Sequence, residues 1–391
     1  MKKRVCILTA TRAEYGLLRN VISKFNQDKG IDLRIAVTGM HLCEEYGMTY
    51  KEIEKDGFTI DVKIPILLNT DDSESVSSAM GLALIHFGHY FARLNPDVLI
   101  VLGDRYETLA VCIAAMNQNI PIAHIHGGEI TEGAIDDAIR HSITKMSYLH
   151  FTSTEEYQKR VIQLGEEPDR VFWVGALGVE NALELQALSK TELEKELGIS
   201  LATPFLLSTF HPVTLEDIED TEKQIDALLS VAVEHSEYIW IFTKANADAG
   251  GKMINRKLDD ISKKYEHIYV YASLGMKRYL SAMKYAEAVI GNTSSGILET
   301  PSFHIPTINI GDRQKGRIQA RTIVNCRAEK DSIEYAIGII KSDEFRRNIR
   351  DMSNPYFRRN TSEEIYRAIK LFLENEDINL EKRFYDIEGI R

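Results

Sequence analysis

The feature that most constrains the fold is an alternation of short β-branched runs with helical patterns along nearly the whole chain. This alternation is typical of parallel β-sheets that are covered by helices on both faces, so we predict an α/β protein. The predicted strands of the first half are Arg4–Thr9, Leu33–Thr38, Thr59–Ile64, Asp97–Leu102, Ile120–Ile125, Leu149–Thr152 and Val171–Val174. Those of the second half are Phe205–Thr209, Tyr238–Phe242, Ile268–Tyr271, Ala288–Ile290, Pro306–Ile310 and Thr322–Asn325.

Two domains are expected because 391 residues exceed what a single hydrophobic core usually organises. The alternation restarts after a charged helix, Thr191–Leu197, and Pro204, which places the boundary within residues 176–203. We therefore predict one doubly wound domain over residues 1–177 and a second over residues 178–360. The two domains would face each other across a cleft.

The end of the chain, residues 361–391, is predicted to hold one more helix and a charged tail. Thr361 is followed by polar residues that end in Glu364, which is a capping signal for the start of a helix. We expect this helix and tail to pack back toward the first domain.

Composition narrows the class of protein. The net charge of −11 argues against nucleic acid or an anionic membrane as a partner, although a local basic pocket for phosphate remains compatible with it. We find no signal peptide and no apolar run of about 18 residues, so a cytoplasmic protein is expected. The cysteines are scattered, which favours buried thiols over disulfides or a metal site. They are Cys6, Cys43, Cys112 and Cys326.

Charged residues gather after the predicted strand Ile120–Ile125, at the end of a strand where ligands bind in open α/β sheets. A Gly-Gly turn follows the strand, and glycines let the backbone approach a ligand where a Cβ atom would not fit. Crowded acids and imidazoles shift each other's pKa values, which acid/base chemistry requires. An Asp–Arg pair four residues apart on a helix is, taken alone, more often a surface ion pair. The residues of this group are Glu129, Asp136, Asp137, Arg140 and His141.

Two more strand ends in the first half carry charges. Arg12 lies where the first strand gives way to a helix, in place of the Gly-x-Gly-x-x-Gly fingerprint of dinucleotide folds, which disfavours an NAD dehydrogenase. A cation at that position suits an anion such as a diphosphate, or forms a structural salt bridge. Asp104 and Arg105 follow another strand, where Asp104 is either catalytic or the cap of the next helix. The nearby pair His86 and His89 lacks a third ligand, so we predict no metal site.

The second half carries the signals for nucleotide binding. A hydroxyl-rich turn follows the predicted strand Ala288–Ile290, and its hydroxyl and backbone N–H groups would form a phosphate cradle, unless they only cap a helix. Glu299, one turn later, suits the ribose hydroxyls. His211 follows another strand and is either a loop histidine or one that reaches across the cleft. Arg313 and Arg317 can neutralise a diphosphate or contact the first domain. The cradle residues are Thr293, Ser294, Ser295 and Gly296.

Together these motifs resemble the hydrolysing UDP-N-acetylglucosamine 2-epimerases, whose two Rossmann-like domains form a glycosyltransferase-B-like fold. Non-hydrolysing cousins carry Glu-Ala-Gly-Leu-Arg where this chain has Gly-Gly-Glu. One departure is Thr293, where the family usually has serine. The likeness covers nearly the whole chain and rests on Thr9–Arg12, Gly103–Arg105, His126–Glu129, Ile135–Asp137 with Arg140 and His141, His211–Thr214, Asn292–Gly296 and Gly311–Gln314.

The resemblance implies conversion of UDP-N-acetylglucosamine and water to N-acetylmannosamine and UDP, the entry step to sialic acids. UDP would leave by anti elimination to give 2-acetamidoglucal, and water would then add with inversion at C2, without metal or redox cofactor. The first domain would hold the sugar, the second the nucleotide. Arg140 would orient Asp136, and His211 would lie by the diphosphate. The family's catalytic carboxylates match Asp104, Glu129 and Asp136, and its nucleotide-binding positions match Arg12, Arg105, Asn246, Thr293, Ser294, Glu299 and Arg313.

Three alternatives stay open. The first is the same chemistry on a UDP- or GDP-linked diacetamido-trideoxy sugar of the legionaminic type, because the contacts to C4 and C6 of the sugar come from unmarked loops. The second is a glycosyltransferase of the same fold. The third is a two-lobed solute-binding protein, which the missing export signal and the acid cluster disfavour. Members of the family form homodimers or homotetramers, and we expect the helices of the first domain to supply the contact.

Overall fold

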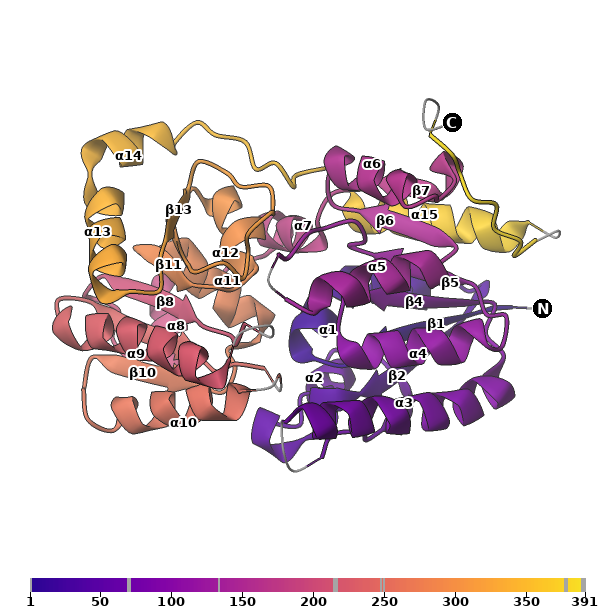
Figure 1. The fold of residues 1–391 in the computed structure, drawn as a ribbon, viewed down its shortest axis with the longest axis horizontal. Coiled ribbons are helices and arrows are strands. Elements are labelled where there is room, and N and C mark those ends of the chain that lie inside the picture. Colours follow the sequence, from indigo (N-terminus) through magenta and orange to yellow (C-terminus); the bar gives the residue numbers. More distant parts are fainter. Residues whose placement is uncertain are drawn as a thin grey trace. The chain divides into compact units, whose positions relative to one another are not determined.

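The structure is a computed structural model that describes residues 2–68, 72–132, 134–213, 217–246, 248, 250–375 and 379–387. The chain divides into two compact units, each built around one parallel sheet (Figure 1). Unit 1 comprises Met1–Glu129, Asp136–Glu180 and Tyr356–Arg391, and unit 2 comprises Ile130–Ile135 and Asn181–Pro355. The chain therefore passes through unit 2 for six residues between two candidate acids, Glu129 and Asp136.

Unit 1 contains a seven-stranded sheet in the order β3-β2-β1-β4-β5-β6-β7, in which neighbouring strands pair in parallel. Chain order reverses between β1 and β4, the kind of switch point beside which doubly wound sheets bind ligands. The strands are β1 (Lys3–Thr9), β2 (Ile31–Thr38), β3 (Ile60–Ile64), β4 (Val98–Leu102), β5 (Ile122–Ile125), β6 (Leu149–Thr152) and β7 (Val171–Trp173).

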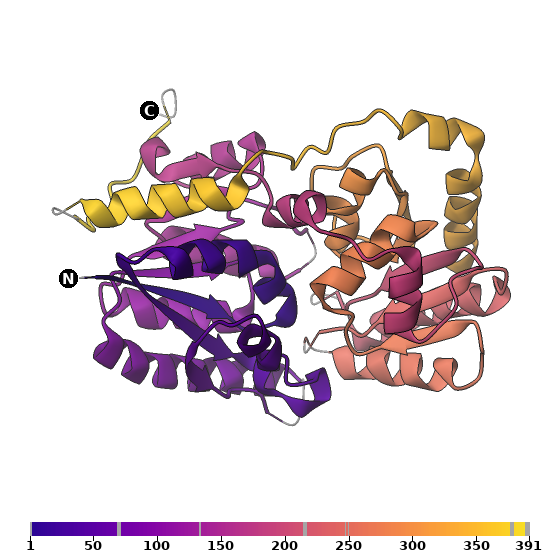
Figure 2. The same ribbon diagram turned by 180° about the vertical axis from the view of Figure 1, so that it is seen from behind.

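Helices cover both faces of this sheet (Figures 1 and 2). Buried residues of β1 alternate between the two layers: Val5 and Ile7 pack with α1 and α15, whereas Cys6 and Leu8 pack with α3 and α4. The helices are α1 (Arg12–Gln27), α2 (Tyr50–Lys55), α3 (Ser73–Leu94), α4 (Tyr106–Met116), α5 (Asp136–Met146), α6 (Glu155–Gln163) and α15 (Thr361–Glu374), with short 3₁₀ turns η1 (Gly39–Leu42), η2 (Glu44–Tyr46) and η3 (Pro168–Arg170). Helix α7 (Leu177–Glu184) begins in unit 1, and its residues from Asn181 onward belong to unit 2.

Unit 2 contains a six-stranded parallel sheet in the order β10-β9-β8-β11-β12-β13. Trp240 and Phe242 fill the layer beneath α9, α10 and α13, and Ile241 faces the opposite layer with α8 and α11. The strands are β8 (Phe205–Thr209), β9 (Ile239–Thr243), β10 (Ile268–Tyr271), β11 (Ala288–Gly291), β12 (Thr307–Ile310) and β13 (Ile323–Cys326). The helices are α8 (Lys190–Leu197), α9 (Ile218–Glu234), α10 (Gly251–Ser262), α11 (Gly275–Tyr285), α12 (Ser295–Leu298), the 3₁₀ turn η4 (Thr300–Phe303), α13 (Lys330–Lys341) and α14 (Asp343–Asn348).

The predicted fold class, two doubly wound α/β domains, is confirmed. Each predicted strand is present, and its ends differ from the prediction by two residues at most. In the part of the chain that the structure describes, none of the helices combines the length and the apolar composition that a bilayer crossing requires.

The helix predicted to start at Thr361 does start there, but the predicted role of Thr361 as its cap is wrong. The residue before α15 is Asn360, which has a left-handed backbone (φ +61°) and forms no side-chain cap. The Thr361 hydroxyl instead donates to the carbonyl oxygen of Val174 at 2.8 Å, because the helix starts against the end of β7. From there α15 runs beside α1 (Figure 2), and Lys370 pairs with Asp28 at 2.7 Å.

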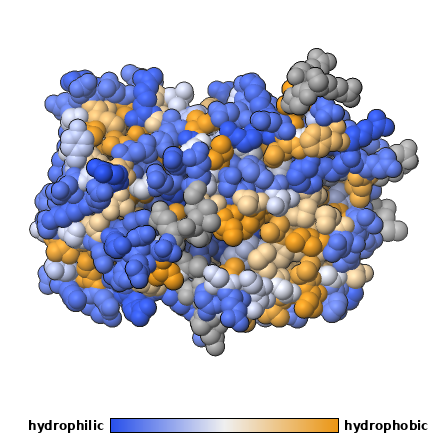
Figure 3. Space-filling view, in the orientation of Figure 1, coloured by the Kyte–Doolittle hydropathy of each residue, from blue (hydrophilic) through white to orange (hydrophobic). Residues whose placement is uncertain are grey.

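Exposed apolar side chains occur together on two helices of unit 1. Leu84 and Ile85 of α3 and Met116 of α4 are 36%, 56% and 46% exposed. Figure 3 shows apolar residues gathered over this part of unit 1.

Candidate functional site

The first group of candidate residues lies where β4 and β5 end. These strands pair in parallel with Leu102 opposite Ile125, so the turns that follow them leave the same edge of the sheet. The turn after β4 carries Asp104, and the turn after β5 carries Glu129. Parallel pairing thus brings together two acids that are 25 positions apart in the chain.

The turn after β5 is tightly constrained. His126 has φ +67°, an uncommon value for a residue with a side chain, and its N–H donates to the carbonyl oxygen of Phe151 at 2.8 Å. Gly128 has φ +80°, and a Cβ atom there would overlap the carbonyl oxygen of Tyr157. Strained backbone of this kind tends to occur at functional sites, where surrounding contacts hold it in place.

Glu129 is buried at the end of this turn, with 2% of its surface exposed. Its Oε1 atom accepts a hydrogen bond from Ser153 Oγ at 2.8 Å and lies 3.6 Å from His126 Nδ1. Ser153, which follows β6, was not among the predicted site residues. The carboxylate is therefore held in one orientation by the neighbouring strand end.

Arg140 connects the acid-bearing segments. Its guanidinium is 1% exposed and forms an ion pair with Asp104, contacts Asp137 at 3.3 Å and donates to the carbonyl oxygen of Glu129 at 2.8 Å. A buried arginine with its planar fork of donors fixes three segments at once. The resemblance implied that Arg140 orients Asp136, whereas the contacts that the structure shows for it lead to Asp104, Asp137 and Glu129.

Of the two readings left open for Asp104, the cap is excluded. The residue at the cap position of α4 is Arg105, not Asp104, and the Arg105 side chain forms no cap hydrogen bond. Asp136 begins α5 and is half-buried. Asp137 and His141 pair across one helical turn at 3.4 Å, as their spacing predicted, and burial lowers the pKa of His141 below its ordinary value.

A second group lies at the ends of β1 and β4. Arg12 is the first residue of α1 and half-buried. Arg105 Nε donates to Glu107 Oε1 at 2.7 Å and lies 4.0 Å from Glu14 Oε1. Burial, reinforced by the charge of Glu107, raises the pKa of Glu14 to about 7. Arg105 is thus placed by two buried carboxylates.

Glu14 and Glu107 were missed from the sequence. Thr11 and Glu14 form a capping box at the start of α1, and the spacing of those two residues is a readable signal. Glu107 is the one acid in a helix that is otherwise apolar over most of its length, which is a weaker signal.

In unit 2, Asn292 joins two loops that carry candidate residues. Its amide accepts from the His211 N–H at 2.7 Å and donates to the His211 carbonyl at 2.8 Å. Its own carbonyl oxygen accepts from Arg313 at 3.2 Å and from Gln314 at 2.8 Å. The Asn246 N–H donates to His211 Nδ1 at 3.4 Å. His211, Asn246 and Arg313 are therefore close together.

The hydroxyl-rich turn lies beside this group, after β11. Thr293 is buried and Ser294 and Ser295 are half-buried, and the Ser295 N–H donates to Thr293 Oγ1 at 3.4 Å. The helix that follows, α12, has only four residues, so its dipole can contribute little to anion binding. Any anion at this turn would have to be bound by the hydroxyl and N–H groups. Glu299 follows this turn and is 6% exposed.

Tyr279, which was not predicted as a site residue, lies beside the same hydroxyl-rich turn. Burial raises the pKa of its hydroxyl above the ordinary value, and hydrogen bonding to Ser295, Thr209 and Thr293 opposes that shift. Tyr279 lies in α11, far from the turn in sequence, so no local pattern indicates it.

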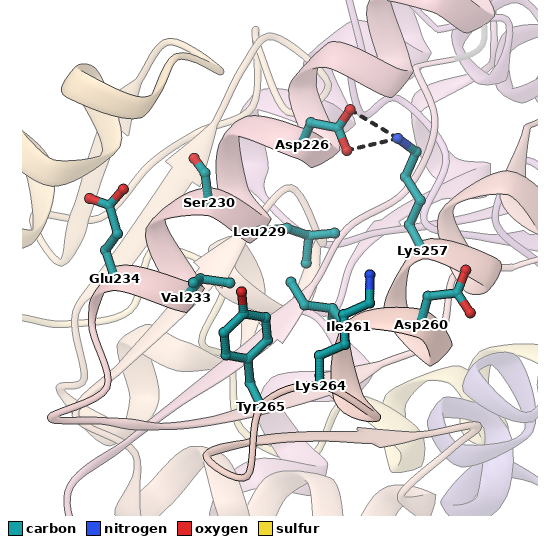
Figure 4. Close-up of a pocket in the computed structure, with 10 residues that line it drawn as sticks. All are labelled: Asp226, Leu229, Ser230, Val233, Glu234, Lys257, Asp260, Ile261, Lys264 and Tyr265. Atoms are coloured by element: carbon teal, nitrogen blue, oxygen red, sulfur yellow. Dashed lines mark hydrogen bonds and ion pairs between the residues drawn. The ribbon is translucent and has the colours of Figure 1, made fainter.

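A separate groove of about 460 Å³ lies between α9 and α10 (Figure 4). Within it, Lys257 pairs with Asp226 at 2.8 Å. None of the predicted site residues lines it. Elsewhere in the described residues, no group of three histidine, cysteine or acidic side chains is arranged to hold a metal ion.

Comparison with known proteins assigns the chain to a family. The family described as UDP-N-acetylglucosamine 2-epimerase matches residues 23–370. The chain belongs to this family. The resemblance stated from the motifs is thereby confirmed, and the protein is an enzyme of the UDP-N-acetylglucosamine 2-epimerase family rather than a binding protein without chemistry.

Two curated relatives of this 2-epimerase are similar over most of their length. A "GDP/UDP-N,N'-diacetylbacillosamine 2-epimerase (hydrolyzing)" of Campylobacter jejuni is 47% identical over 348 residues, which are 89% of this chain and 90% of the relative. The "Polysialic acid biosynthesis protein P7" of Escherichia coli is 43% identical over 386 residues, 98% of each chain. The first name states diacetylbacillosamine, and the second states polysialic acid biosynthesis.

Among solved structures, a UDP-GlcNAc 2-epimerase from Neisseria meningitidis bound to UDP-GlcNAc has a TM-score of 0.78 and 17% identity. The match covers 94% of this chain and 100% of that chain. At this identity the likeness shows the fold alone, which agrees with the two parallel sheets of this 2-epimerase.

Proposed function

We propose that the enzyme is a hydrolysing 2-epimerase that converts a UDP-linked 2-acetamido sugar and water to the free C2-epimer and UDP. The first candidate reaction is UDP-N-acetylglucosamine to N-acetylmannosamine. The observation that carries the proposal is the buried Arg140, which holds Asp104, Asp137 and the Glu129 backbone together at adjoining strand ends. A set of acids fixed in this way suits proton transfer at two faces of a sugar ring.

The proposed reaction has two steps. In the elimination, a carboxylate removes the C2 proton, the electrons of that C–H bond form a C1–C2 double bond, and the C1–O bond breaks to release UDP. In the hydration, the oxygen of water bonds to C1 while one of its protons passes to a base, and a proton is delivered to C2 from the opposite face. The sum adds one water molecule and inverts C2, and acid/base groups alone suffice, so we propose no cofactor.

The two faces of the ring require groups with different tasks. Asp104, Glu129 and Asp136 are the candidates for the base and the acid, with Asp137 and Arg140 holding them in place. Glu129 is the most buried of the three and has a fixed orientation through Ser153, which suits a group that must meet one hydrogen atom.

The departure of UDP requires that the developing diphosphate charge be neutralised. We propose that His211, Asn246 and Arg313, which the structure brings together around Asn292, bind the diphosphate with the hydroxyl groups of Thr293, Ser294 and Ser295. Gly296 allows close packing of this turn against β12, and Glu299 would bind the ribose hydroxyls. In unit 1, Arg12 and Arg105 are the cations proposed for the same nucleotide sugar.

A second candidate substrate is a UDP- or GDP-linked diacetamido-trideoxy sugar. The relative at 47% identity, whose name states diacetylbacillosamine, favours it. The relative at 43% identity over 98% of the chain, named for polysialic acid biosynthesis, favours N-acetylglucosamine. The acid/base chemistry is the same for both donors.

The proposal is tested by incubating the enzyme with each donor separately and following free nucleotide and sugar products by NMR. A hydrolysing 2-epimerase yields equal amounts of UDP and of the free C2-epimer. A non-hydrolysing epimerase would yield the epimeric nucleotide sugar and no free UDP, and a glycosyltransferase would yield UDP only with an acceptor. Either of those results would contradict the proposal, and the donor with the higher kcat/KM identifies the substrate.

We also propose that the enzyme is a homodimer or homotetramer that associates through α3 and α4. Leu84, Ile85 and Met116 supply exposed apolar surface there. Light scattering should give a multiple of the 44.4 kDa chain mass, and Ile85→Glu should shift it toward the monomer.

A further inference from the structure

His124 is a fully buried histidine in the strand that leads to the acid-bearing turn. Its Nε2 atom lies 2.8 Å from the carbonyl oxygen of Gly103, and its Nδ1 atom lies 3.2 Å from the hydroxyl of Thr144. Gly103 follows β4, His124 belongs to β5, and Thr144 lies in α5. One imidazole therefore joins three segments.

The two contacts determine which nitrogen carries the proton. A carbonyl oxygen only accepts, so Nε2 must donate to Gly103, and Nδ1 must then accept from the Thr144 hydroxyl. Burial lowers the pKa of His124 to about 3, which keeps the ring neutral over the working range of pH. The result is a directional chain from the Thr144 O–H through the ring to the Gly103 carbonyl.

This chain of hydrogen bonds connects the same segments that the proposed catalytic acids occupy. Gly103 immediately precedes Asp104, and Thr144 lies one turn after Arg140 in α5. The ion pair of Asp104 and Arg140 and the His124 chain thus link the turn after β4 to α5 in two places.

The Gly-Gly turn also packs against the imidazole. A Cβ atom at Gly127 would lie 3.1 Å from both His124 Nδ1 and Thr144 Oγ1, which is closer than ordinary contact. The backbone that leads to Glu129 therefore lies directly on the hydrogen-bonded pair. Moving either partner would move the turn.

We propose that His124 is a positioning residue of the 2-epimerase reaction: its neutral imidazole sets the spacing between the Asp104 turn, the Glu129 turn and α5. The proposal rests on the function proposed above, because it assumes that these segments carry the reacting acids. A buried polar side chain is costly in a strand unless it is fully hydrogen-bonded, and here both ring nitrogens are engaged.

The sheet itself offers a matched control. His150 of β6 lies opposite His124 in the parallel register and is equally buried, with both residues at 0% exposure. Its Nε2 contacts Glu166 at 2.9 Å, and Glu166 also pairs with Lys145 at 2.6 Å. Loss of either imidazole should therefore cost stability, but His150 reaches α5 only indirectly, through Glu166 and Lys145, whereas His124 bonds directly to Gly103 and to Thr144 of α5.

The experiment compares His124→Leu with His150→Leu and adds His124→Gln as a conservative variant. The glutamine amide places an N–H donor near the position of the histidine Nε2 and so keeps the bond to Gly103, whereas leucine keeps neither bond. For each variant, kcat, KM and UDP affinity are measured, and rates are referred to the folded fraction given by the stoichiometry of UDP binding.

Leucine at position 124 should lower kcat about 100-fold, the effect of misplacing reacting groups by about 1 Å, while UDP affinity stays at the wild-type value. Glutamine at position 124 should restore most of kcat. Leucine at position 150 should lower the melting temperature and leave kcat of the folded enzyme unchanged.

Equal loss of kcat in His124→Leu and His150→Leu, or wild-type kcat in folded His124→Leu, would overturn the proposal. Measurements on the wild-type enzyme distinguish a failure of this proposal from a failure of the proposed function. If wild type releases UDP and free epimer but His124→Leu does so equally well, only the role of His124 fails. If wild type releases no UDP from any donor, the proposed function fails, and the role of His124 fails with it.

Discussion

The side-chain amide of Asn292 and the backbone of His211 bond to each other in both directions, at 2.7 Å and 2.8 Å. The side-chain amide thus pairs with both the N–H and the carbonyl of one residue, as the backbone of a neighbouring β-strand would. Because Arg313 bonds to the Asn292 carbonyl oxygen, the position of this one asparagine determines where a histidine and an arginine of the proposed diphosphate site lie.

Asn292→Asp should weaken UDP binding about 10-fold and destabilise the enzyme by about 1–3 kcal/mol, because a carboxylate cannot donate to the His211 carbonyl and leaves it unpaired. Isothermal titration with UDP and thermal unfolding measure the two effects. Asn309→Asp is the control, since Asn309 is also buried in unit 2 but bonds to Asn325. Unchanged UDP affinity in Asn292→Asp would show that its contacts do not shape the nucleotide site.

Glu129→Gln should abolish release of UDP from the nucleotide sugar and leave UDP affinity nearly intact. Glutamine can still accept the hydrogen bond from Ser153, so the fold of the turn should persist, but it cannot take up a proton. Glu132→Gln, at a side chain 54% exposed, is the control and should retain turnover. If Glu129→Gln loses turnover and UDP binding equally, Glu129 is structural.

Glu14 should make stability depend on pH. Its pKa is about 7 in the folded enzyme against 4.5 as its ordinary value, so between these values the folded state holds a proton that the unfolded state has lost. Stability therefore falls as pH rises from about 4.5 to 7, by about 3 kcal/mol in total. The Glu14→Gln variant has no carboxyl group to titrate at this position. Its free energy of unfolding relative to wild type should therefore rise as pH rises from about 4.5 to 7.

Urea unfolding of both proteins at pH 5 and pH 8.5 measures this effect. Glu192 provides the control, because it occupies the same place in a capping box at the start of α8 but is exposed, and hydrogen bonds from Ser189 lower its pKa. Glu192→Gln should therefore leave the relative stability almost the same at pH 5 and pH 8.5, because a lowered pKa confines its proton uptake to pH values below about 4.5. A Glu14→Gln difference that does not vary with pH would mean that Glu14 is ionised in the folded enzyme.

Gly128→Ala should destabilise the enzyme by more than the cost of a left-handed alanine, which is about 1–2 kcal/mol. Its Cβ atom would overlap the Tyr157 carbonyl oxygen, so the turn that carries Glu129 would have to move and kcat should fall as well. Gly198→Ala separates the two causes, because Gly198 has φ +71° with nothing near its Cβ position. Equal losses of stability in the two variants would exclude the overlap as a cause.

The strands and their polar ends could be predicted because each depends on local sequence. Leu149–Thr152 and Phe205–Thr209 were predicted to the residue, since each is a short apolar run with polar neighbours. The acids at strand ends were found because parallel strands place their carboxyl ends at one edge. The family resemblance followed from the order of those motifs.

What the sequence could not reveal depended on contacts between distant segments. The partner of Arg140 across the sheet, Asp104, lies 36 positions away and is set by the pairing of β4 with β5. Thr361 was assigned as a cap, but its hydroxyl donates to the carbonyl oxygen of Val174, just after β7, and sequence spacing does not reveal this contact. Glu107 and Tyr279 were missed for the same reason, because only tertiary packing brings each to its site.

The central claim is that this chain removes and replaces the C2 proton of a nucleotide-linked sugar. The most direct measurement is an incubation with UDP-N-acetylglucosamine, and in parallel with the diacetamido donor, in deuterated water, followed by NMR of the released sugar. The account predicts free C2-epimer carrying deuterium at C2, in amounts equal to the UDP released. UDP release with hydrogen retained at C2 would mean simple hydrolysis of the glycosidic bond and would contradict it.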